Sequence, residues 1–336
     1  MMRRPALLIL SAALACDDDA GSEPAYVPPV PSFPAADDPR PFVLSEVGLF
    51  HEGAPAPDLI TFEPTYALWS DGLEKRRWLR LPEGATLDTR DPDHWQLPVG
   101  AILFKDFALR APGEANARSL ETRVIARTGP GPMDYWMGAF VWRADGSDAD
   151  FARAGVVDVA GSDHDVPSAE RCWSCHIGTP GRVLGLGVVQ LAADKPGAVT
   201  LDELAPRLSD AVPTPALDVD AEAREALGYL HGNCAHCHSP TGVARPDTDL
   251  DLSWSVADLD LADTGAWRTA VGIATRSWIR PEAPLRIAPG EPDRSAVVVR
   301  MRARGTTDQM PPLATEHVDE AGLVILTTWI ASLGAP

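Results

Sequence analysis

Residues 172–176 read Cys-Trp-Ser-Cys-His and residues 234–238 read Cys-Ala-His-Cys-His, so the chain carries the pattern Cys-x-x-Cys-His twice. Two residues between the cysteines allow both thiols to reach the two vinyl groups of one haem, and the adjacent histidine then falls beneath the iron. The motifs contain every cysteine after Cys16. They predict two covalently bound c-type haems. The attaching thiols would be Cys172, Cys175, Cys234 and Cys237, and the proximal iron ligands His176 and His238.

Three other uses of two Cys-x-x-Cys pairs fit the sequence less well. A single zinc site built from both pairs usually has about 15–20 residues between them, whereas 58 residues separate Cys175 from Cys234. A thioredoxin-type dithiol would lie in a βαβ unit, usually after a tryptophan, and Arg171 and Asn233 stand in that place. Two structural disulfides would leave the adjacent histidines unexplained.

The sequence around the second motif predicts the rest of a haem pocket. Apolar residues at helical spacing predict helices over 201–208, 220–231 and 319–333. Met310-Pro311-Pro312 lies just before the last of these, and it resembles the axial-methionine loop of c-type cytochromes, in which prolines stiffen the loop that holds the thioether on iron. Met310 is therefore the predicted sixth ligand of the second haem. Histidine–methionine ligation raises the reduction potential of such an iron.

The first motif has no comparable partner. No methionine lies between His176 and Cys234, so the first haem takes its sixth ligand from elsewhere or has none. The candidates that the sequence leaves open are His164, His231, Met301, His94, His51, Met133 and Met137.

Short apolar runs separated by turn residues, between Phe42 and about Ala160, predict an antiparallel β domain. The predicted fold class is α+β, with this β domain followed by a mainly α-helical, cytochrome c-like haem region. The predicted divisions are a signal peptide (1–16), a tether (17–41), the β domain (42–160), a first haem segment (161–219) and a second haem domain (220–336).

The N-terminus predicts export. Arg3 and Arg4 precede a short apolar run, as in a secretory signal, and this run is too short for the ~20 residues of a membrane-spanning helix. Leu14-Ala15-Cys16 resembles a bacterial lipoprotein box, so Cys16 is the predicted lipidation site; ordinary cleavage nearby is the alternative. Residues 17–41 hold seven prolines and few large apolar residues, as expected of a tether. The predicted location is the periplasm or cell envelope, with a lipid anchor in a membrane.

Charge narrows the choice of partners. The chain has 48 acidic and 29 basic residues, a formal net charge of −19, which disfavours nucleic-acid binding. Lys75, Arg76, Arg77 and Arg80 form its dense basic cluster. A solvated strand edge is the favoured interpretation of this cluster, and an acidic partner or haem propionates are the alternatives.

From about Leu44 onward the chain resembles a family of exported di-haem c-type cytochromes of Gram-negative bacteria with a non-haem N-terminal domain. The resemblance depends on residues 66–72 (Tyr-Ala-Leu-Trp-Ser-Asp-Gly), 97–100 (Leu-Pro-Val-Gly), 121–123 (Glu-Thr-Arg) and 229–238, which include the second motif. It implies haem binding and electron transfer, without a defined substrate. The predicted function is electron transfer between a donor and a redox partner protein in the envelope. The alternatives are a haem enzyme, a di-haem peroxidase or oxidoreductase with an open first haem, and a β domain that binds a ligand served by the haems.

Overall fold

The computed structural model describes residues 26–35, 38–193 and 195–334. Its central element is a six-stranded antiparallel sheet in which every strand pairs with the next strand along the chain, from β3 to β8. The strands are β3 (Ile60–Thr61), β4 (Glu74–Arg80), β5 (Ile102–Leu109), β6 (Arg118–Arg127), β7 (Tyr135–Trp142) and β8 (Ala149–Phe151). A separate two-stranded sheet consists of β1 (Phe50–His51) and β2 (Ala54–Pro55).

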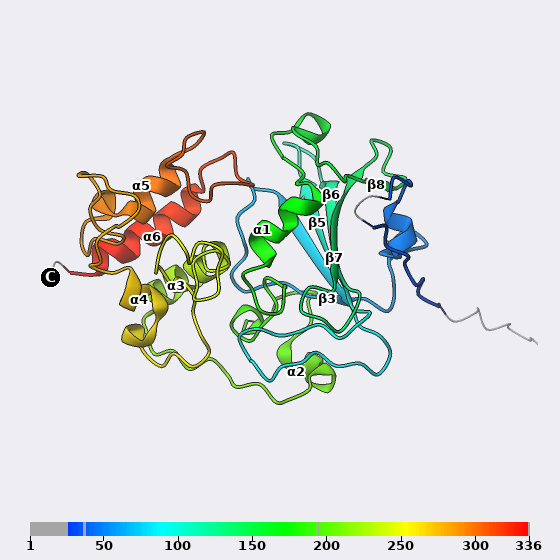
Figure 1. Cartoon of the computed structure of the whole chain (residues 1–336), viewed down its shortest axis with the longest axis horizontal. Coiled ribbons are helices and arrows are strands. Elements are labelled where there is room, and N and C mark those ends of the chain that lie inside the picture. Colours follow the sequence, from blue (N-terminus) through cyan, green and yellow to red (C-terminus); the bar gives the residue numbers. More distant parts are fainter. Residues whose placement is uncertain (1–25, 36–37, 194, 335–336) are drawn as a thin grey trace, which may run out of the picture.

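Both faces of the sheet are covered, because successive side chains of a strand point to opposite faces. On one face, Trp78, Phe104 and Phe140 pack against Phe42 and Leu44 from the chain before β1. The opposite face is turned toward the C-terminal half of the chain. Figure 1 shows the sheet on one side of the molecule and α3 to α6 on the other, with α1 between them.

Helices are short apart from two. The α-helices are α1 (Cys172–His176), α2 (Leu201–Leu204), α3 (Ala221–Asn233), α4 (Gly265–Thr269), α5 (Ala296–Arg302) and α6 (Glu320–Ser332). The 3₁₀ turns are η1 (Leu44–Val47), η2 (Val159–Gly161), η3 (Ala169–Arg171), η4 (Val189–Leu191), η5 (Ala205–Arg207), η6 (Leu261–Asp263) and η7 (Pro292–Arg294). Aspartates begin both long helices: Asp220 accepts a hydrogen bond from the Ala223 backbone N–H, and Asp319 from that of Gly322.

The prediction of a mainly α-helical haem region is wrong. The structure is mostly antiparallel sheet with few helices, 23% of the chain being helical. The physical reason is the frequency of helix-ending residues, since the chain contains 32 prolines and 27 glycines. The helix expected over 201–208 illustrates this: α2 ends at Leu204, and Pro206, which lacks a backbone N–H, lies in the 3₁₀ turn that follows.

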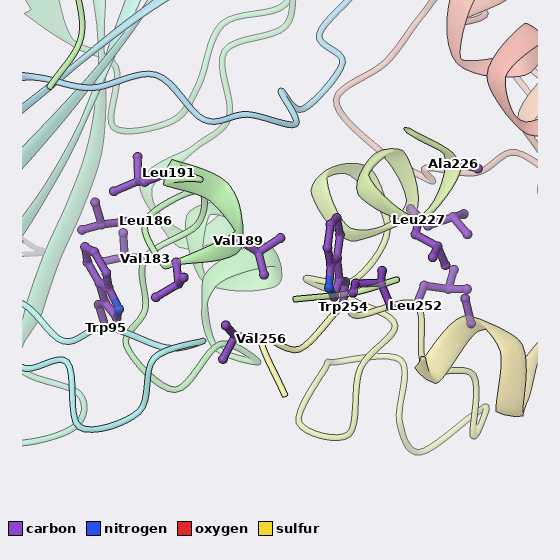
Figure 2. Packing of buried hydrophobic residues seen from close by; sticks show 14 of the residues in the cluster. Trp95, Val183, Leu186, Val189, Leu191, Ala226, Leu227, Leu252, Trp254 and Val256 are labelled. Carbon is purple, nitrogen blue, oxygen red and sulfur yellow. The ribbon is translucent and has the colours of Figure 1, made fainter. Parts of the chain in front are cut away.

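One hydrophobic cluster connects the sheet with the C-terminal helices. Its buried members run from Phe62, just after β3, to Ile330 in α6. Figure 2 shows Trp95, Val183, Leu186 and Leu191 on one side of this cluster, with Leu227 and Trp254 on the other. The two halves of the chain therefore share a core.

Candidate functional site

A large cavity lies between the sheet and the C-terminal half of the chain, with a volume of about 960 Å³. This is at the upper end of the ~300–1,000 Å³ typical of small-molecule and cofactor sites. Its walls come from β4 to β6, from residues 183–190, from the end of α3 and from 296–315. All six predicted haem-attachment and proximal residues line it, namely Cys172, Cys175, His176, Cys234, Cys237 and His238.

The first motif forms the whole of α1. The 3₁₀ turn η3 leads directly into this helix, and the Cys172 thiol donates a long hydrogen bond to the Ser168 carbonyl at 3.8 Å. Cysteines three apart lie on the same side of a helix, so both thiols face the cavity. Burial raises the pKa of Cys172 to about 11, and neither thiol is in a disulfide. The first motif therefore presents two free sulfurs to the cavity.

His176 is held in a definite orientation. Its Nδ1 lies 2.8 Å from the backbone carbonyl of Arg182, a residue with a positive φ of 59°. Because a carbonyl only accepts, Nδ1 carries the proton and Nε2 keeps its lone pair. Burial lowers the pKa of His176 to about 4, so the imidazole is neutral. A neutral ring whose other nitrogen donates to a carbonyl is the usual state of a metal-ligating histidine.

The second motif starts where α3 ends. Asn233, the last residue of α3, is 4% exposed; its Oδ1 accepts from the Trp69 backbone N–H at 2.7 Å and its Nδ2 donates to the Tyr229 carbonyl. This fixes the start of the motif relative to the segment before β4. Burial lowers the pKa of His238 to about 4, and its Nδ1 is buried with no hydrogen-bond partner among the described residues.

The two motifs meet although 58 residues separate them in sequence. Cys175 lies beside Cys237 and His236, and these neighbours hold the pKa of the Cys175 thiol below its ordinary range. The proximity of Cys175, together with burial, raises the pKa of Cys237. The segments after the motifs are also in close contact, since a Cβ atom on Gly178 would lie 2.9 Å from the Cα of Gly242.

Met310 lines the same cavity as His238, as does Met301. The loop that carries Met310 is tied to α5: the Met310 backbone N–H donates to the Arg300 carbonyl at 3.0 Å, and Arg300 Nε donates to the Asp308 carbonyl. Met301 is 5% exposed within α5. Both methionines therefore remain available to the second motif, with Met310 on a loop and Met301 on a helix.

The candidates for the sixth iron ligand of the first haem fall into two groups. His164, His231, His94 and Met301 line the cavity, whereas His51, Met133 and Met137 do not. His164 Nε2 lies 2.7 Å from a carboxylate oxygen of Glu121, and His231 Nδ1 accepts from the Trp254 backbone N–H. Burial lowers the pKa of His231 to about 4.

A buried charge cluster on the sheet was not predicted as a site. Glu121, 0% exposed, accepts hydrogen bonds from Arg123 Nε at 2.6 Å and Nη2 at 3.0 Å, and also contacts His164. Burial alone would raise the pKa of Glu121, but Arg123 and His164 lower it overall. The His164 ring stacks on Phe107 with centroids 5.4 Å apart. Residues 121–123 were among those that carry the family resemblance. Nothing in the sequence indicated that Glu121 contacts a histidine 43 residues later.

The interpretation of the basic cluster as a solvated strand edge is wrong for two of its four members, Arg77 and Arg80, which are buried; Arg76 is exposed. All four lie in β4, which pairs with β5 along its whole length. Arg80 is 5% exposed and pairs with Asp58, and Arg76 pairs with Asp106 at 2.7 Å. Arg77 points to the opposite face and lines the cavity.

Comparison with known proteins gives no match to a family model, to a curated protein or to a solved structure. Within residues 26–35, 38–193 and 195–334, no group of three or more His, Cys, Asp or Glu side chains is arranged to hold a metal ion. In the same residues, no helix is both long and apolar enough to cross a membrane. Cys16 and the predicted signal peptide lie outside the described part of the chain.

Proposed function

We propose that the chain is a di-haem c-type cytochrome that carries electrons between a donor and a partner protein in the bacterial cell envelope. One observation carries the proposal: both Cys-x-x-Cys-His motifs, with free thiols and neutral imidazoles, line a single cavity of about 960 Å³. The thiols of Cys172 and Cys175 would hold one haem, and those of Cys234 and Cys237 the other. When bound, haem iron supplies one-electron redox chemistry.

The residues present fit such a group. His176 presents Nε2, because its Nδ1 is committed to the Arg182 carbonyl. The imidazole of His238 is neutral, and its buried Nδ1 has no hydrogen-bond partner among the described residues. Leu103, Phe107 and Ile125 contribute apolar surface to the cavity, which suits the apolar body of a haem. His176, His238 and Met310 are the proposed axial ligands.

A second candidate function is a haem enzyme with an open first site. It is favoured by the buried Glu121–His164 pair, in which His164 Nε2 lies 2.7 Å from a carboxylate oxygen of Glu121. The Glu121–His164 pair, which lines the cavity through His164, could then hold a proton close to a substrate.

Haem attachment is tested on protein produced in a bacterial host that matures c-type cytochromes. Intact mass should show two haem additions that survive acid-acetone extraction. The paired change Cys172→Ala with Cys175→Ala should remove one addition, and Cys234→Ala with Cys237→Ala the other. A zinc ion without haem would contradict the proposal. Electron paramagnetic resonance then separates the two functions: two low-spin irons support the electron carrier, and one high-spin iron supports the enzyme.

The sixth ligand of the second haem is tested by a matched pair of variants. Met310→Ala should abolish the weak far-red band of methionine-ligated ferric haem, open the iron to cyanide and lower its potential, because the thioether favours the ferrous state. Met301→Ala is the control, since Met301 lines the same cavity from α5. Loss of the band in Met301→Ala alone would transfer the assignment to Met301.

The proposed lipid anchor is tested by fractionation. An acyl chain contributes about 0.8 kcal/mol for each buried CH₂ group, so several chains hold a protein firmly on a membrane. The wild-type protein should sediment with membranes, and Cys16→Ser should release it or block processing. A wholly soluble wild-type protein without an acyl mass would contradict the anchor.

A further inference from the structure

Three cations form a row across the cavity face of the sheet. Arg77 of β4 is the register partner of Lys105 of β5, and Lys105 is the partner of Arg123 of β6. Directly opposite residues in an antiparallel pair have Cβ atoms about 4.5–5.5 Å apart and point to the same side. All three side chains line the cavity. The row therefore concentrates positive charge on one wall of the candidate site.

Only one end of this row is neutralised. Arg123 pairs with Glu121, which raises the pKa of Arg123 overall although burial opposes it. Arg77 is 6% exposed, and although Glu63 acts on it at longer range, its guanidinium has no hydrogen bond or ion pair within the described residues. Lys105 Nζ lies 4.7 Å from the Phe107 ring centroid and, likewise within that part of the chain, has no acid partner. Burial lowers the pKa of Arg77 to about 10 and that of Lys105 well below its ordinary value.

Such a row destabilises the empty sheet. Like charges directly opposite one another are unfavourable, and the removal of an unpaired cation from water is costly. Two carboxylates, Glu121 beside Arg123 and Glu63 at longer range from Arg77, face the three basic side chains. The neighbouring register positions Leu103 and Ile125 are apolar and line the cavity too. A ligand that complements this wall carries negative charge beside a hydrocarbon body.

We propose that Arg77, Lys105 and Arg123 form a binding site for carboxylates attached to an apolar body. An arginine guanidinium can donate two parallel hydrogen bonds to the two oxygens of one carboxylate, and the lysine between the arginines adds a compact positive charge. Two sources share this chemistry. The first source is the propionate pair of a haem held at the first motif, and this possibility rests on the proposed function. The second source is a free dicarboxylic acid, and this possibility is independent of the proposed function.

The test uses the protein as purified, with succinate as the free probe at constant ionic strength. The variants are Lys105→Met and Arg77→Gln, with Arg77→Lys as the conservative variant expected to keep the response. Arg118→Gln is the matched control, because Arg118 lies in β6 of the same sheet, is exposed and has no ion pair within the described residues. Folding of each variant is checked by circular dichroism. The readouts are the thermal midpoint with and without succinate and the haem reduction potentials.

The two sources give different results. If propionates fill the site, succinate leaves the wild-type midpoint unchanged, and both neutralised variants lower the potential of one haem, because a cation near the haem favours the reduced state. If a free acid fills it, succinate raises the wild-type midpoint saturably and binds at least tenfold more weakly to both variants.

Absence of both responses, or equal responses in Arg118→Gln, would refute the carboxylate site. If the carboxylate site is refuted in a protein that carries two haems, the proposed function still stands. A haem-free protein that binds succinate saturably refutes the proposed function and supports the site.

Discussion

Replacement of Glu121 by glutamine should destabilise the protein strongly. Glu121 is 0% exposed and is the partner of both Arg123 and His164. Glutamine has nearly the same shape, so the change removes the charge and leaves the packing in place. Arg123 then lacks its counter-ion, beside the buried Arg77 and the half-buried Lys105 of the same row.

The magnitude follows from the burial of this pair. Removal of one partner of a buried ion pair costs about 3–5 kcal/mol. The amide oxygen of glutamine still accepts one hydrogen bond from Arg123, so we expect the lower end, about 3 kcal/mol. Typical domains have a free energy of unfolding of about 5–15 kcal/mol, so this loss is a large fraction of the total.

A second substitution isolates the electrostatic cause. Lys105→Met removes a neighbouring cation, so Glu121→Gln should cost at least about 1 kcal/mol less in that background than in the wild type. The assay is urea unfolding followed by tryptophan fluorescence and circular dichroism. The control is Glu74→Gln, because Glu74 is an exposed carboxylate that pairs with Arg110 on the same sheet. A loss below about 1 kcal/mol for Glu121→Gln, or strict additivity with Lys105→Met, would refute the reasoning.

Three further predictions concern the second half of the chain. Gly178→Ala should lower the free energy of unfolding by about 1–3 kcal/mol, because its Cβ would meet the backbone of Gly242 at 2.9 Å; an unchanged urea midpoint would contradict this contact. Tyr229→Phe should cost about 1–3 kcal/mol, because the Tyr229 hydroxyl donates to Asp319 at 2.8 Å and that carboxylate also begins α6; unaltered stability in the same assay would remove this tie between the helices.

Stability should also depend on pH through His231, whose pKa is lowered from 6.5 to about 4 by burial. As pH falls below about 6.5 the unfolded chain binds a proton that the folded protein does not, so about 3 kcal/mol of stability is lost between pH 6.5 and 4. His231→Asn should flatten this part of the curve, and an unchanged slope would contradict the assignment.

The sequence allowed prediction of local features and not of those that depend on distant contacts. Helices α3 and α6 form where apolar periodicity predicts helices. The short helices between them, α4 and α5, were missed, because five and seven residues carry too little apolar periodicity to predict a helix. The meeting of Cys175 with Cys237 was also inaccessible, since it depends on how 58 intervening residues return to the sheet.

The basic cluster shows the same limit. Sequence adjacency groups Arg76, Arg77 and Arg80, but strand alternation sends Arg77 to the cavity and the other two to the opposite face. The partners of Arg77 in its row come from β5 and β6. Register between strands, and not spacing along the chain, decides which charges act together.

The shared core of Figure 2 has a consequence for attempts to divide the gene. A cut in the connection between η5 and α3, within 208–220, would leave Trp95 and Val189 in one fragment and Leu227 and Trp254 in the other. Each fragment alone would expose the apolar face that its missing half covers and would be prone to aggregate. Coexpressed, the same faces would drive the two polypeptides to reassemble, so the sheet and the C-terminal helices should complement each other in trans while neither folds by itself.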